Sequence, residues 1–96
     1  SKDDLINMAL GILEDKGYIL DEASINELRN TIDELYNNKN LTLKNALMVK
    51  QYLDILIREQ SIRICDIRIN NKEMNVIKTE DLIKSREKFI LKNIYN

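Results

Sequence analysis

The chain offers chemistry chiefly at Gln51 and Asp54, a carboxamide and a carboxylate three residues apart near its middle. Three residues is almost one helical turn, so on a helix both side chains leave the same face. There they present hydrogen-bond donors and acceptors together. A simpler interpretation exists, because Lys50 lies four residues before Asp54 and Arg58 four residues after it. That is the spacing of ordinary ion pairs on a helix surface.

The usual catalytic sets are missing from the sequence. It contains no His, which excludes a Ser–His or Cys–His nucleophile and an imidazole acid or base. The single Cys65 cannot form an intramolecular disulfide, and a zinc site built from Cys and His is excluded. There is no Gly-rich phosphate loop and no acidic calcium loop. An enzyme built from this chain would do easy chemistry or complete the active site of another protein.

Composition indicates one folded domain, residues 1–96. Hydrophobic residues make up 44% of the 96 and charged residues 32%, as in globular chains. The absence of Pro and the presence of only two Gly favour long helices. No apolar run is long enough for a membrane span, and the acidic start is unlike a signal peptide. We therefore expect a cytoplasmic protein without membrane contact. The excess of Ile and Asn over Ala is typical of a low-GC bacterium or its phage.

Charge is distributed unevenly along the chain. Residues 1–23 carry two basic and six acidic side chains, a net charge of −4. Residues 24–60 are neutral, and residues 61–96 have a net charge of +3. A tail this weakly basic is little evidence for nucleic acid, which we do not expect as a partner but do not exclude.

The first predicted element is an N-terminal helix over residues 3–15. Its apolar positions exceed what one buried stripe requires, and Gly17 provides the C-terminal stop. We expect this helix to be buried on two sides or to bind a partner, including a second copy of the chain.

The central prediction is an antiparallel helical hairpin, residues 24–60, with helices at about 24–37 and 43–59. Each helix carries four apolar residues spaced three, four and three apart, Ile25, Leu28, Ile32 and Leu35 in the first and Ala46, Val49, Leu53 and Leu56 in the second. Asp21 or Ser24 caps the first helix, Ser24 with Glu27 as a capping box, and Thr42 caps the second. A loop this short joins neighbouring antiparallel helices.

Residues 61–96 are expected to extend this core. Ile62, Ile64, Ile67 and Ile69 alternate with polar residues up to Asn70-Asn71, which predicts a small β-hairpin over about 62–77. Thr79, followed by acidic residues, starts a C-terminal helix to about residue 94. The predicted fold class is therefore mainly α, with a small β-hairpin.

A known family shares part of this pattern. The residues concerned are Ile25-Asn26-Glu27-Leu28-Arg29, Leu41-Thr42 after the loop, and Lys50-Gln51-Tyr52-Leu53-Asp54. Over residues 25–59 the chain resembles, without a gap, the stage 0 sporulation protein E-like aspartyl-phosphate phosphatases. The hallmark of that family is Ser-Gln-Glu-Leu-Asp, of which Gln51, Leu53 and Asp54 are kept and two positions differ.

The resemblance implies binding to a phosphorylated response-regulator receiver domain and hydrolysis of its aspartyl-phosphate, in sporulation or two-component signalling. Gln51 and Asp54 would be catalytic, placing a water in line with phosphorus. Lys50, Tyr52 and Arg58 would contact the partner. No cofactor is implied, since any Mg would belong to the regulator. Lys50 and Tyr52 replace Ser and Glu, so a member that binds without hydrolysis is the alternative.

Two further function classes fit the predicted elements. Three helices followed by a β-hairpin over 62–77 give the element order of a winged-helix DNA-binding regulator. Against it, the second hairpin helix is almost balanced in charge, with three basic and two acidic side chains, and it has few base-reading side chains. The third class is a phage or bacterial protein–protein interaction module without catalysis, which would use the apolar first helix.

Overall fold

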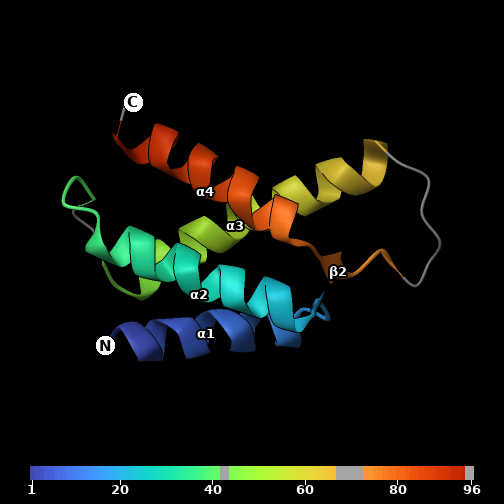
Figure 1. Cartoon of the computed structure of the whole chain (residues 1–96), viewed down its shortest axis with the longest axis horizontal. Helices are drawn as coiled ribbons and strands as arrows, with labels where there is room; N and C mark the ends of the chain where they lie inside the picture. Colours follow the sequence, from blue (N-terminus) through green and yellow to red (C-terminus); the bar gives the residue numbers. More distant parts are fainter. Residues whose placement is uncertain (42–43, 67–72, 95–96) are drawn as a thin grey trace.

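The computed structural model describes residues 1–41, 44–66 and 73–94 (Figure 1). Its helices and strands are, in order, α1 (Lys2–Asp15), β1 (Ile19–Leu20), α2 (Glu22–Asn37), α3 (Ala46–Asp66), β2 (Val76–Ile77) and α4 (Thr79–Ile94). The prediction of a mainly helical fold with a small β element is confirmed, although the two strands are parallel and do not form a β-hairpin.

Side-chain caps fix where the first two helices begin. The Ser1 hydroxyl accepts a hydrogen bond from the backbone of Asp4, and the Asp4 carboxylate returns one, forming a capping box. The Asp21 carboxylate accepts from the backbone N–H of Ser24 at 2.8 Å, so Asp21 caps α2. Between the two helices, Gly17 turns the chain with φ of +86°, a conformation that favours Gly.

Ser24, the other predicted cap, lies inside α2 and has a different partner. Its hydroxyl donates to the carbonyl of Ile77 at 3.1 Å and so joins α2 to β2. At the start of α3, the Asn45 side chain accepts from the backbone N–H groups of Leu47 and Met48. The predicted cap Thr42 lies outside the described residues.

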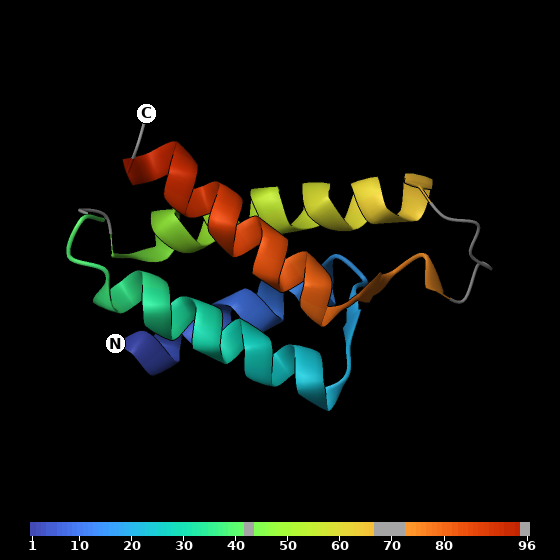
Figure 2. The same cartoon turned by 45° about the horizontal axis from the view of Figure 1, so that its top comes forward.

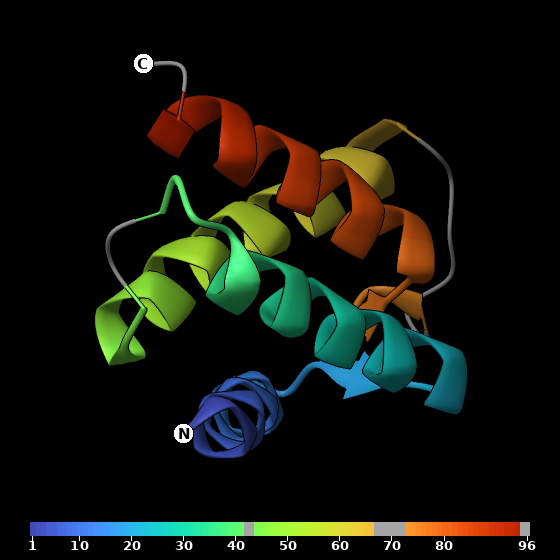
Figure 3. The same ribbon diagram turned by 60° about the vertical axis from the view of Figure 1, so that its left-hand side comes forward.

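The four helices form a ring in the order α1, α2, α4, α3, in which each packs against its two neighbours. The predicted hairpin helices α2 and α3 run in opposite directions (Figure 2). They lie diagonally across the ring, however, and their apolar seams belong to one core cluster that α1 and α4 complete. Figure 3 shows α1 almost end-on, lying across one side of the other helices.

One apolar cluster fills the ring. The predicted seam positions Leu28, Ile32 and Leu35 of α2 are completely buried in it, as are Val49 and Leu56 of α3. Burying a side chain of this size stabilises the fold by about 1.5–3 kcal/mol. The seam also includes Leu53, whereas Ala46 is exposed.

Part of the apolar excess of α1 is used within the chain, whereas Met8, Leu10 and Ile12 are only partly buried. Four of its side chains are buried, Leu5, Ile6, Ala9 and Leu13. Because α1 packs against both α2 and α3, it is buried on two sides, which was one of the two predicted outcomes. The chain itself therefore covers these four side chains, which are not available to a second copy.

The β-hairpin predicted over 62–77 is not formed. The helix α3 continues to Asp66 and includes the start of the first predicted strand, whereas residues 67–72 lie outside the described part. The sheet instead pairs β2 in parallel with β1, Ile19 opposite Val76 and Leu20 opposite Ile77. Strand propensity is a preference that tertiary contacts override, and Arg63 makes its contacts from a helix. The described residues therefore lack the β-hairpin that the winged-helix interpretation requires.

Candidate functional site

The predicted catalytic pair lies on an open helix surface. Lys50, Gln51, Asp54 and Arg58 are all exposed on α3. Lys50 and Asp54 line one side of an open depression between α3 and α1, and Gln51 is not among its lining residues. The helix thus brings Gln51 and Asp54 to one surface, as predicted, but encloses neither in a pocket.

The ion pairs expected from the spacing on α3 are also absent. Within the described ranges 1–41, 44–66 and 73–94, none of Lys50, Asp54 and Arg58 forms an ion pair. Within the same ranges no cluster of His, Cys, Asp and Glu side chains suits a metal ion. These three charged side chains therefore face solvent without forming an ion pair in the described ranges.

Tyr52, predicted to contact a partner, is instead an internal residue. It is completely buried, and its ring meets that of Phe89 edge to face, with centroids 5.9 Å apart. Its hydroxyl lies 2.7 Å from the Ser85 hydroxyl on α4. Burial raises the pKa of Tyr52 above its usual value. Tyr52 joins α3 to α4 and cannot touch a partner, so that prediction is wrong.

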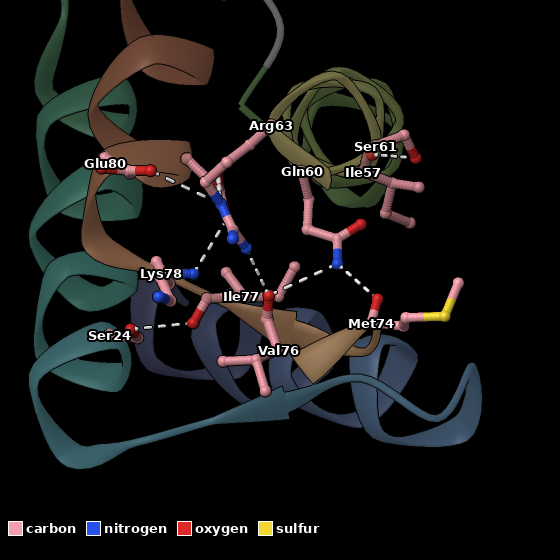
Figure 4. A network of polar contacts seen from close by, with 11 residues as sticks. Ser24, Ile57, Gln60, Ser61, Arg63, Met74, Val76, Ile77, Lys78 and Glu80 are labelled. Atoms are coloured by element: carbon pink, nitrogen blue, oxygen red, sulfur yellow. Dashed lines mark hydrogen bonds and ion pairs between the residues drawn. The ribbon is translucent and has the colours of Figure 1, made fainter. Parts of the chain in front are cut away.

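The sequence did not indicate the buried ion pair that Arg63 forms with α4 (Figure 4). Arg63, near the end of α3, donates from Nε and Nη2 to both carboxylate oxygens of Asp81 on α4, at 2.8 and 3.1 Å. The side chains are only 8% and 2% exposed. These hydrogen bonds raise the pKa of the Arg63 guanidinium.

The same end of α3 holds the strand β2. Arg63 Nη2 also donates to the carbonyl of Val76 at 2.8 Å. Gln60 donates from Nε2 to the carbonyls of Met74 and Val76, at 2.7 and 3.3 Å (Figure 4). Asp81 accepts from the backbone N–H of Lys78 at 2.9 Å. We call Gln60, Arg63 and Asp81 the polar clamp, because together they fix β2 against α3 and α4.

A signal for the polar clamp was present in the seam. Gln60 and Arg63 follow Leu53 and Leu56 at the same spacing of three and four residues, and both are buried. A helix extended past residue 59 places them on the buried face, where long polar side chains reach backbone carbonyls. The partner Asp81 is 18 residues away from Arg63. No local pattern reveals a pair at that separation.

Residues 1–89 match the AAA lid domain family. The chain belongs to this family. No curated protein and no solved structure matches the chain. The match spans α1, the central helices and most of α4, so it includes the elements that the shorter resemblance over residues 25–59 left unexplained.

The family assignment corrects the functional predictions. The chain is not a stage 0 sporulation protein E-like phosphatase, and a response-regulator receiver domain, sporulation and two-component signalling are no longer indicated. The structure gives the physical reason for the error. In α3 of this lid domain, Leu53 is buried while Gln51 and Asp54 are exposed. Any amphipathic helix with this seam has the same alternation.

Within the described part of the lid domain, no helix is both long and apolar enough to cross a membrane.

Proposed function

We propose that this chain works as the lid of an AAA+ ATPase in the cytoplasm, packing beside a nucleotide-binding domain. The observation that carries this proposal is the family match over residues 1–89. The 96 residues contain no G-x-x-x-x-G-K-[ST] sequence. The nucleotide site would therefore lie in a domain outside these residues, and the lid would act through contact with that domain.

The exposed surface of α3 is the best candidate for this contact. We define the α3 face as Leu47, Lys50, Gln51, Asp54 and Arg58, all of them exposed. Leu47 is 50% exposed, which leaves a large apolar side chain in water. Beside it lie the three charges that find no ion-pair partner in the described chain. An apolar anchor surrounded by unpaired charges suits a polar protein–protein contact.

Ties between the helices support action as a rigid unit. Arg86 on α4 donates from Nη1 to Glu27 on α2 at 2.9 Å, and its Nε lies 3.1 Å from Glu34. The polar clamp connects α3 to α4 and β2. Because the packed helices and these contacts resist separate movement, a push on the α3 face would be transmitted to the whole lid.

The test measures ATP hydrolysis by AAA+ ATPase domains of the same organism, with and without the chain. A change in rate together with direct binding by calorimetry is expected. Leu47→Asp and Lys50→Glu should each weaken binding by about tenfold, the order found when a contact of ~1.4 kcal/mol is lost. Lys39→Glu is the matched control, since Lys39 is also exposed but lies in the loop after α2.

Two results would count against the proposal. Failure of the chain to bind any of these domains, or to alter hydrolysis, would remove the lid function. Equal weakening by Lys39→Glu and Lys50→Glu would show that the α3 face is not the contact.

A further inference from the structure

The two outer edges of the small sheet are treated differently by the fold. On the outer edge of β2, the carbonyls of Met74 and Val76 accept hydrogen bonds from Gln60 and Arg63 (Figure 4). Side chains of α3 thus occupy the place that a third strand would take. This edge of the sheet is closed.

The outer edge of β1 has no such cover. Ile19 donates its backbone N–H to the carbonyl of Asn75 on the β2 side, at 2.9 Å. Backbone groups alternate along a strand, so those of Leu20 point away from β2. In the described part of the chain, the Leu20 N–H donates to no side chain and to no loop or turn carbonyl. An unpaired strand edge is a template for another strand.

An apolar pocket lies next to this edge. Its lining is made by Leu10 and Glu14 of α1, Tyr18 and Leu20 around β1, and Ile25 of α2. The four apolar side chains are only partly buried by the chain. In a strand added to β1, every second side chain would point toward the pocket. An aliphatic side chain there would cover the apolar lining.

The chain segment around the pocket lining, residues 14–22, is acidic, and the basic Lys78 lies near its Asp21. Glu14, Asp15, Asp21 and Glu22 are all exposed, and Lys16 is the one basic residue in residues 14–22, which gives that segment a net charge of −3. Within the described chain none of the four carboxylates forms an ion pair. We call these carboxylates the acidic rim. They favour a basic ligand, and they oppose a second copy, which would bring two acidic rims together.

We propose that the β1 edge and its pocket bind an extended, basic segment of a partner protein. The backbone of the segment pairs with Leu20 as a third strand. An aliphatic side chain fills the pocket, and Lys or Arg side chains lie against the acidic rim. This binding site is separate from the α3 face and does not depend on the lid function.

The test is a titration of the isotopically labelled 96-residue chain with pooled peptides, followed by amide NMR shifts. The peptides alternate Val, Ile or Leu with Lys or Arg. We expect shift changes centred on residues 18–21 and on Ile25, with affinity that falls as salt is added. A pool with Glu in place of Lys and Arg should bind at least tenfold more weakly. Peptides N-methylated at alternate residues should lose binding, because they cannot pair with the edge.

Charge reversal on the protein locates the site. Glu14→Lys should weaken the basic pool about fivefold, whereas Glu87→Lys, the same change at an exposed position of α4, should leave binding unchanged. The proposal is overturned by any of three results. These are no shifts near β1 with the basic pool, equal binding of the acidic pool, or equal effects of Glu14→Lys and Glu87→Lys.

Discussion

Replacing Asp81 by Asn tests how far the polar clamp holds the fold together. The substitution keeps the size of the side chain and removes its charge. Asp81 is almost completely buried and accepts two hydrogen bonds from Arg63 and one from the backbone of Lys78. Asn offers one acceptor oxygen in place of two and leaves the guanidinium without its buried counter-charge. Removing one partner of a buried ion pair typically costs about 3–5 kcal/mol.

The lower end of that range is expected here. Glu80 remains 3.5 Å from Arg63 Nε and supplies part of the missing charge. It is 56% exposed, so water screens much of its attraction. We therefore expect Asp81→Asn to lower the free energy of unfolding by about 3 kcal/mol. Domains of this size are stable by about 5–15 kcal/mol, and each kcal/mol corresponds to about 4–8 °C in Tm.

Urea unfolding followed by helical circular dichroism measures the effect directly. Glu80→Gln is the matched control, because it makes the same chemical change one residue earlier, beside the same arginine. It should cost less than about 1 kcal/mol, as exposed ion pairs do. A loss below about 1 kcal/mol for Asp81→Asn, or equal losses for the two variants, would refute the view that the clamp is a main support of the fold.

Substitutions at two further residues, Tyr52 and Asp21, test other contacts. Tyr52→Phe removes the hydrogen bond to Ser85 and should cost about 1 kcal/mol, whereas Tyr52→Ala should cost about 3–5 kcal/mol; equal thermal destabilisation would contradict this. Because burial raises the pKa of Tyr52, its contribution is complete below about pH 10 and is lost at higher pH, so Tyr52→Phe should reduce the alkaline loss of stability. Hydrogen bonds from Ser24 lower the pKa of Asp21, so its contribution is present above about pH 4 and is lost as pH falls through the lowered value. Asp21→Asn keeps a cap that does not titrate, and acid unfolding by circular dichroism should then show less loss than in the unchanged chain.

Local sequence information was sufficient for most of the helices. The C-terminal helix begins at Thr79 and ends at Ile94, as predicted, because an acidic first turn and an apolar period are properties of neighbouring residues. The seam of α2 was identified for the same reason. The partners of this seam could not be predicted locally, because the packing of α1 and α4 against both α2 and α3 depends on surfaces far apart in the chain.

The strand predicted from Ile62 and Ile64 shows where local reasoning fails. Alternation of β-branched and polar residues favours a strand only when the alternate faces are those that become buried. Here Arg63 is the buried residue and Ile62 is exposed, which reverses the assumed faces. The reversal is stabilised by Asp81 and by the carbonyl of Val76, both contributed by a later part of the chain.

The phosphatase resemblance failed for a related reason, and Tyr52 shows it most directly. The shared Gln51, Leu53 and Asp54 follow the exposed–buried–exposed order that an amphipathic helix imposes, so their agreement carries little information about catalysis. Position 52 is different, because its side chain lies on the side of α3 that faces α4. Glu there, as in the phosphatase hallmark, requires solvent or a partner, whereas Tyr52 fills the space between α3 and α4. Tyr52 in place of Glu was therefore more informative than the three matching residues. A buried aromatic side chain at this position indicates that a further helix, here α4, covers this side of α3.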